Sequence, residues 1–221
     1  NGFILANDVS QDTIDNYQLQ PQIIQTEMNI GKIPNNCHWN FDNGYYGWKN
    51  IIFLKNKNID AYIPDQELAK KRNKKSNYQD TLDYNSDKDL FTTQEGKEFI
   101  FQYQSFDRTK DRVQRVYVLK ENNQIVKTIK VIPAYTERKE MKIKMRTEEG
   151  RAAYKIRAQT VEPVIGDLKE NKLIINFLTR SLETVRTEFN IASIGHNLNK
   201  IWIQKHKKKK DMGHNKNNLF L

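Results

Sequence analysis

The stretch CHWNFDNGYYGWKNIIFLKNKNIDAYIP, residues 37–64, decides the fold class of this 221-residue chain. Its two ends, CHWNFD and IDAYIP, predict short strands, and the segment WKNIIFLKNKN between them predicts a helix. Asn43-Gly44 turns the chain after the first strand, and Pro64 stops the second. Strands that alternate with helices are typical of parallel pairing, so we expect an α/β layer here.

The residues before this stretch extend the same pattern. FILANDV, residues 3–9, predicts a strand, and the segment from Asp15 to Ile30 predicts a helix. Asn1-Gly2 is a hairpin signal, because the turn that joins two hairpin strands favours these residues at its positive-φ positions. Since a hairpin needs a strand on each side, we expect the chain to be a piece that lacks the first strands of its sheet.

The α/β pattern breaks after Pro64. Residues 65–98 are polar, rich in lysine and without a period, which predicts an exposed loop. EFIFQYQ, residues 98–104, and RVQRVYVLKENNQIVKTIKVIP, residues 112–133, predict a small antiparallel sheet with a turn at residues 121–123. We therefore expect a β-rich insertion within the α/β pattern.

Helical patterns return in the last third of the chain. TEEGRAAYKIRAQTV, residues 147–161, predicts a helix that resumes after Pro163 and reaches Lys169. Beyond it, a broad apolar stripe predicts one long C-terminal helix; its members are Phe177, Leu178, Leu182, Val185, Phe189, Ala192 and Ile194. The resulting division is an α/β part at 1–64, a polar loop and β-rich insertion at 65–146, a helical part at 147–203 and a basic, disordered tail at 204–221.

The composition of the chain limits the kinds of partner and binding site that it can have. The formal net charge of +10 and a pI near 9.5 favour a polyanionic partner such as nucleic acid. The single cysteine, Cys37, excludes an intrachain disulfide and a cysteine zinc site, and we expect it to be buried. No apolar run approaches the roughly 18 residues that span a bilayer, so we expect a cytoplasmic protein without a membrane partner. The basic runs 70–75 and 205–210 are typical of solvated segments, or of phosphate contacts if DNA is the partner.

Asp42 is a candidate metal ligand. It lies at the end of a predicted strand, and ligand sites of open α/β sheets gather beyond the carboxyl ends of strands. The alternative is an Asx-turn, in which the carboxylate accepts hydrogen bonds from the amides that follow.

Glu162 and Lys169 are seven residues apart, which places them two turns apart on one face of a helix. This arrangement suits a carboxylate for metal and an ammonium for phosphate; the alternative for Glu162 is to stabilise a helix start beside Pro163. Tyr154 and Arg157, one turn apart, either stack on a base and grip a phosphate or simply cover the helix surface.

Together these segments resemble the DDE transposases of bacterial insertion sequences, in the subgroup with a β-rich insertion before the last acidic residue. The resemblance rests on four stretches in order: NGFILANDVSQDTIDNYQL, FDNGYYGWKNIIFLKNKNIDAYIP, RAQTVEPVIGDLKEN and SLETVRTEFNIASIGHNLNKIW. It implies a ribonuclease H-like mixed sheet flanked by helices, interrupted by the insertion and followed by a long C-terminal helix.

The resemblance also implies a site. Family members hold two Mg²⁺ ions with three carboxylates, of which Asp42 would be the second and Glu162 the third. Tyr154, Arg157 and Lys169 would match a Tyr-Arg-Glu-Lys signature that contacts DNA, although Arg157 lies one residue further from the glutamate than in that signature. DNA is then the partner, and a homodimer holding two DNA ends is expected.

The first carboxylate of the family has no match in this sequence, because its position lies upstream of Asn1. We therefore expect a transposase catalytic-domain fragment that is inactive as this chain stands. Two alternatives remain open at this point: a DNA-binding protein without enzyme activity, and a decayed reading frame.

Overall fold

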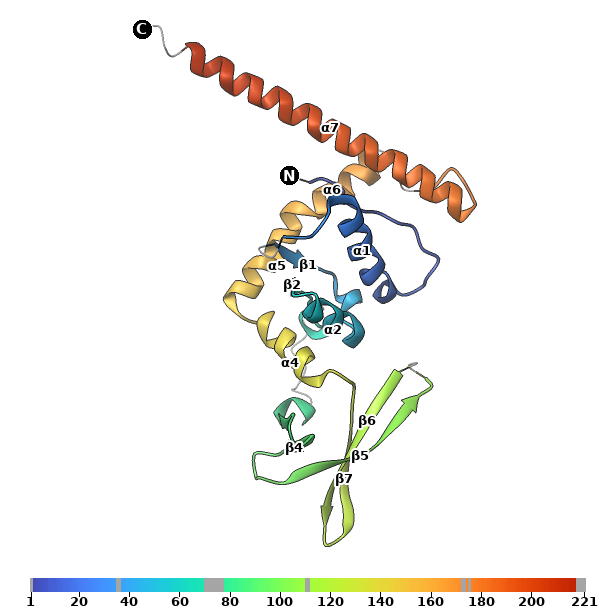
Figure 1. Cartoon of the computed structure of the whole chain (residues 1–221), viewed down its shortest axis with the longest axis vertical. Helices are drawn as coiled ribbons and strands as arrows, with labels where there is room; N and C mark the ends of the chain where they lie inside the picture. The colour runs from blue at the N-terminus through green and yellow to red at the C-terminus, as the bar shows by residue number, and fades with distance from the viewer. Residues whose placement is uncertain are drawn as a thin grey trace. The chain divides into compact units, whose positions relative to one another are not determined.

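The computed structural model describes residues 2–34, 37–69, 78–109, 112–171, 174 and 176–217 (Figure 1). The chain divides into two compact units, of which unit 1 comprises Asn1–Pro34 and Ala152–Leu221 and unit 2 comprises Asn35–Arg151. The described strands form a two-stranded parallel sheet and a five-stranded antiparallel sheet. Helices accompany both, so the predicted α/β class is confirmed.

The parallel pair forms as predicted from residues 37–64. Strand β1 (His38–Asn40) pairs in parallel with β2 (Asp60–Tyr62). The connection between them runs through the 3₁₀ turn η2 (Asn43–Tyr45) and helix α2 (Trp48–Asn56). Buried side chains of α2, of β2 and of the residue after β2 hold this layer together; they are Ile51, Leu54, Ala61, Tyr62 and Ile63. Cys37, just before β1, is exposed, so the expectation of a buried cysteine is wrong.

The β-rich insertion is an antiparallel meander. Its strands are β3 (Asp83–Asn85), β4 (Leu90–Thr92), β5 (Glu98–Asp107), β6 (Arg112–Glu121) and β7 (Gln124–Val131), adjacent in that order. Asn122 and Asn123 join β6 to β7 with positive φ at both positions, as a tight hairpin turn requires. The predicted sheet and its turn are thus confirmed.

The prediction of a loop at residues 65–98 is wrong in part. Helix α3 (Gln66–Ala69), the 3₁₀ turn η3 (Tyr78–Thr81) and strands β3 and β4 lie within it. The two strands are too short to show an alternating pattern, and they pair only because Leu90 and Phe91 bury themselves against β5. The basic run at 70–75 lies outside the described residues.

The carboxylate of Asp89 connects the turn between β3 and β4 to strand β6. Asp89 accepts hydrogen bonds from the hydroxyls of Tyr84, at 2.9 Å, and Tyr117, at 2.8 Å, and it pairs with the guanidinium of Arg115. Burial, with the hydrogen bond to Asp89, raises the pKa of Tyr117 far above its ordinary value. The neutral phenol is therefore the form that the folded sheet holds. The apolar core beneath consists of Leu82, Phe91, Phe99, Tyr117, Leu119, Ile129 and Val131.

Two helices follow the sheet. Helix α4 (Tyr135–Lys144) leads into α5 (Glu148–Thr160), which confirms the predicted helix at residues 147–161. Gly150 allows the close approach of the two, because a Cβ atom at this position would lie 2.0 Å from the carbonyl oxygen of Lys144. Lys144 in turn forms an ion pair with Asp60 on β2 and lies over the Tyr62 ring, 3.9 Å from its centroid.

Unit 1 brings together the two ends of the sequence. It contains the 3₁₀ turn η1 (Asp15–Tyr17), helix α1 (Leu19–Ile30), the short helix α6 (Glu162–Gly166), the π-helical turn η4 (Asp167–Asn171) and the long helix α7 (Leu182–Asn217). The predicted helix near residues 15–30 and the long C-terminal helix are confirmed. Because α7 continues to Asn217, the prediction of a disordered tail is wrong for residues 204–217. Within the described residues, no helix is both long and apolar enough to cross a membrane.

Residues 3–9 form no strand, so that prediction is wrong. Side chains of two helices take the place of a partner strand. The N–H of Ile4 donates to Oδ1 of Asn197 at 2.9 Å, and Nδ2 of Asn197 donates back to the Ile4 carbonyl at 2.8 Å. Asn29 on α1 donates to the Leu5 carbonyl at 2.8 Å. The apolar run at the start of this segment is typical of a strand, but side-chain amides of α7 and α1 take up backbone groups of Ile4 and Leu5 that a strand would use for pairing.

Candidate DNA-binding and metal-binding residues

Asp42 lies at the carboxyl end of β1, where the sequence placed it. Phe41, directly after β1, donates its N–H to the Tyr62 carbonyl at 3.0 Å and so continues the pairing with β2 by one residue. Asp42 then caps η2, with Oδ1 accepting the N–H of Asn43 at 2.6 Å. The Asx arrangement considered from sequence is therefore present. It fixes the carboxylate at an exposed strand end, which is compatible with a ligand role.

Tyr154 and Arg157 form one cluster on α5. Nη1 of Arg157 donates to the Tyr154 hydroxyl at 3.1 Å, and the guanidinium carbon is 5.9 Å from the ring centroid. Both side chains are half-buried. The hydrogen bond orients the guanidinium along the helix, which reduces the freedom that Arg157 would lose on gripping a phosphate.

Glu162 occupies the first turn of α6, immediately after a break in the helical chain. Helix α5 ends at Thr160, and the Val161 carbonyl accepts the N–H groups of Val164 and Ile165 at 3.1 Å to begin the new helix. Glu162 is exposed at this N-terminus, where the helix dipole favours a negative charge. The position suits either of the roles foreseen for it.

Lys169 lies in η4, a turn of π-helix that continues α6. In a π-helix each N–H bonds to the carbonyl five residues earlier, and each residue turns by a smaller angle than in an α-helix. Lys169 is therefore rotated away from the helix face that it would share with Glu162 in an ideal α-helix. The prediction that Glu162 and Lys169 lie on one helix face is therefore only approximate. Single π-turns are frequent at functional sites, and this one presents Lys169 to solvent.

A buried histidine anchors the π-turn. His196 on α7 is 1% exposed, and its Nδ1 lies 2.6 Å from Oδ2 of Asp167 in η4. Its Nε2 lies 2.8 Å from the carbonyl oxygen of Gly2. Both ring nitrogens of His196 therefore have partners within unit 1. The segment that carries Lys169 is thus tied to α7 and to the N-terminal segment.

The candidate residues divide between the two units. Tyr154, Arg157, Glu162 and Lys169 all lie in unit 1, on the consecutive segments α5, α6 and η4. Asp42 lies in unit 2.

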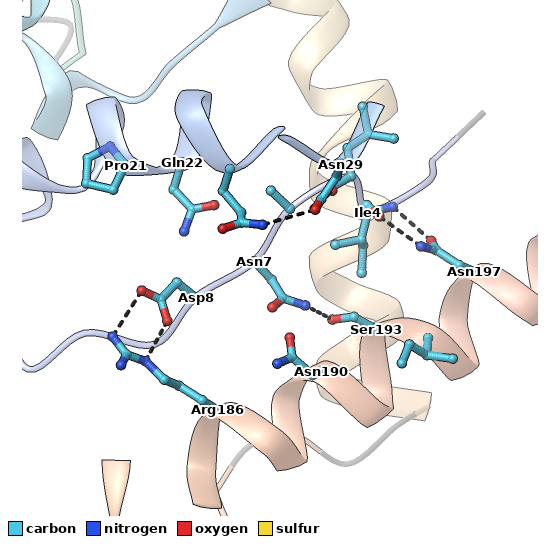
Figure 2. A pocket seen from close by; sticks show the side chains of 14 residues that line it. Ile4, Asn7, Asp8, Pro21, Gln22, Asn29, Arg186, Asn190, Ser193 and Asn197 are labelled. Carbon is cyan, nitrogen blue, oxygen red and sulfur yellow. Dashed lines mark hydrogen bonds and ion pairs between the residues drawn. The ribbon is translucent and has the colours of Figure 1, made fainter. Parts of the chain in front are cut away.

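Unit 1 also has a polar hollow that no sequence pattern indicated. About 760 Å³ in volume, it lies between residues 4–8, α1 and the first half of α7 (Figure 2). Arg186 contributes a charge that Asp8 neutralises at 2.7 Å, and Asn7 donates to the Ser193 hydroxyl at 2.6 Å. The lining consists mostly of amide and apolar side chains, among them Ile194 of α7. Isolated Asn and Gln residues have no period and no motif, which is why sequence reasoning missed this hollow.

Magnesium prefers carboxylate oxygens, and the exposed carboxylates of Asp42 and Glu162 are donors of that kind. In the part of the chain that the structure describes, no group of three or more His, Cys, Asp or Glu side chains is placed to hold a metal ion. The chemistry of the two donors fits Mg²⁺, and their assignment as ligands remains a prediction from the sequence.

Comparison with known proteins adds one finding. Residues 94–202 match the family model described as the transposase DDE domain. The match starts in the antiparallel sheet, includes α5, α6 and η4 with Glu162, and ends within α7; Asp42 precedes it. No curated protein and no solved structure matches the chain. Through residues 94–202, the chain belongs to the DDE transposases.

Proposed function

We propose that this chain binds DNA for transposition, and that Asp42 and Glu162 hold Mg²⁺ at the phosphate where strand cleavage and transfer take place. The observation that carries the proposal is the match of residues 94–202 to the transposase DDE domain. Bound metal would supply an activated water or 3′ hydroxyl and would stabilise the leaving oxygen. We further propose that the β1–α2–β2 layer belongs to a ribonuclease H-like sheet.

The basic residues of unit 1 position the DNA backbone. Arg157, oriented by the Tyr154 hydroxyl, offers a planar pair of donors that matches two phosphate oxygens. Lys169 offers a compact charge on the π-turn one short helix away. Glu162 starts the helix between them, so a metal held there would lie next to the phosphate that these residues grip.

Acting alone, the chain is expected to bind DNA without cutting it. The family uses three carboxylates, and this sequence supplies two at matching positions, Asp42 and Glu162. The formal net charge of +10 favours the binding role even without catalysis. A dimer on two DNA ends, acting in the cytoplasm, completes the proposal. Nicking of duplex DNA with Mg²⁺ by the purified chain, abolished by Asp42→Ala, would refute the inactivity.

DNA binding is tested by fluorescence anisotropy with a labelled duplex over a series of salt concentrations. Each phosphate contact adds about 0.9 to the slope of log affinity against log salt. Arg157→Gln and Lys169→Gln should each weaken binding and lower the slope by about 1. Lys155→Gln is the matched control, because Lys155 is an exposed lysine on the same helix as Arg157. Equal losses in all three variants would refute a specific role for Arg157 and Lys169.

Metal binding is tested by calorimetric titration of the chain with Mn²⁺, a magnesium substitute, in the presence of DNA. Asp42→Asn and Glu162→Gln each remove one charged donor and should weaken metal binding about tenfold or more. Glu170→Gln is the control, since Glu170 is an exposed carboxylate in η4 outside the predicted ligand set. Unchanged metal affinity in both test variants would remove Asp42 and Glu162 from the site.

A further inference from the structure

Helix α7 has a packed face within unit 1 and, around the helix from it, a face with exposed apolar side chains. One face packs on unit 1 through Val185, Ser193 and His196, whose exposed fractions are 8%, 4% and 1%. The predicted apolar stripe is therefore only partly right. Val185 lies on the packed face, Phe189 and Ala192 are half-buried, and Ile194 points to solvent with 58% of its surface exposed.

The opposite face is a regular seam of large exposed side chains. Ile191, Ile194, Leu198 and Ile201 are 65%, 58%, 60% and 43% exposed, and together they are called the α7 seam. At about 100° per residue, Ile194 and Leu198 lie roughly 160–200° around the helix from buried His196. In the part of the chain that the structure describes, all four side chains are open to solvent over much of their surface, and Ile194 also borders the polar hollow of unit 1. Single exposed apolar residues are normal, but an ordered row of them marks an interface.

The spacing of the α7 seam identifies the kind of partner. Its intervals of three, four and three residues are the a and d positions of a heptad, the pattern by which one helix packs along another. A helix with the same intervals is self-complementary, because in an antiparallel pair Ile191 lies opposite Ile201 and Ile194 lies opposite Leu198. A second copy of this chain supplies that helix through a two-fold axis level with residue 196.

The distribution of charge along α7 determines whether the two helices pair in parallel or antiparallel. The helix begins with Glu183 in its first turn and carries the lysine-rich run at residues 205–210 toward its other end. A parallel pair would bring the two lysine-rich runs together, which like-charge repulsion opposes. An antiparallel pair separates them and sets Glu183 of one copy level with residue 209 of the other. It also aligns the helix dipoles head to tail.

We propose that the α7 seam forms an antiparallel interface between two copies of this chain, independently of DNA. The proposal does not rest on the metal chemistry above, and DNA-free protein tests it. Trp202, 59% exposed and with its ring centroid 4.1 Å from that of His206, extends the contact beyond Ile201. Glu188 does not take part, because its carboxylate accepts the N–H groups of Leu178 and Thr179 within unit 1.

Sedimentation equilibrium of the full chain measures the pairing. We expect a concentration-dependent dimer whose dissociation constant rises about 100-fold in Leu198→Glu, because a buried charge replaces a central apolar anchor. Ile203→Glu is the matched control: Ile203 is 45% exposed on the same helix but lies on the other side. Circular dichroism confirms that both variants keep their helix content. A monomeric wild type, or equal weakening by both variants, would refute the α7 seam as the interface.

Cysteine pairing tests the direction. In a Cys37→Ser background, Ile194→Cys and Leu198→Cys chains are oxidised separately and as a mixture. The antiparallel register predicts a disulfide dimer in the mixture and little in either chain alone. Disulfide dimers in each chain alone would show a parallel pair and overturn the proposed direction. Binding of wild type to anionic vesicles, lost in Leu198→Glu while the protein stays monomeric without them, would replace the second copy by a membrane surface.

Discussion

Replacing Asn197 tests whether amide side chains substitute for a strand. Its side chain forms two hydrogen bonds with the Ile4 backbone, at 2.9 and 2.8 Å, across nearly the whole length of the sequence. Each such bond contributes a net 0.5–1.5 kcal/mol, so Asn197→Ala should cost about 2 kcal/mol of local stability. A change of that size corresponds to a factor of about 30 in an opening equilibrium.

Hydrogen exchange of the Ile4 amide measures this effect directly, because that N–H donates to Asn197. We expect exchange at Ile4 to become about 30-fold faster in Asn197→Ala. Asn190→Ala is the control, since Asn190 lines the same hollow on the same helix. Exchange at Ile4 that is unchanged in Asn197→Ala, or equally faster in the control, would show that residues 3–9 are held by something other than these amide bonds.

Three further predictions concern unit 2. Gly150→Ala should lower the free energy of unfolding of unit 2 by about 2 kcal/mol or more, measured by urea unfolding, because the new Cβ would lie 2.0 Å from the Lys144 carbonyl oxygen. A loss below about 0.5 kcal/mol would contradict this close approach. Asp89→Ala removes the acceptor of the buried Tyr117 hydroxyl and should cost about 3 kcal/mol by the same assay, whereas Tyr117→Phe in the Asp89→Ala background should recover part of it. Burial raises the pKa of Asp60, but its hydrogen bonds from Lys144 and His38 outweigh burial and hold the pKa below its ordinary value. Stability from Asp60 is therefore full above its unfolded pKa and lost as pH falls through the lowered folded pKa, and Asp60→Asn should flatten the stability profile in that acid range.

The parts that the sequence predicted well depend on local pattern. The β1–α2–β2 layer and the β6–β7 hairpin carry their periodicity and turn residues within short segments. Asp42 was placed at a strand end for the same reason. Where residues far away in the sequence determine the structure of a segment, its local sequence pattern does not predict that structure. Residues 3–9 begin with an apolar run typical of a strand, but side chains of α7 and α1 bond to their backbone.

The candidate site shows the same limit. The one-turn spacing of Tyr154 and Arg157 indicated that they share a helix face, but the hydrogen bond between them is seen in the structure alone. The face shared by Glu162 and Lys169 followed from ideal helix geometry, and the π-turn shifts it. A π-turn depends on tertiary anchors, here the contact of Asp167 with His196, which lies 29 residues further along the chain. No local sequence pattern around Asp167 or His196 indicates that the two residues are in contact.

The anchoring of Gly2 by His196 has a consequence for the order of folding. The two residues are 194 positions apart, and unit 1 is assembled from both ends of the chain, whereas unit 2 is one continuous segment. During synthesis, unit 2 can fold as soon as it leaves the ribosome, but residues 2–9 must wait for α7. Contacts of such long sequence separation form slowly, because the loop between them must close first. Residues 2–9 therefore stay open to chaperones and proteases until α7 has been made.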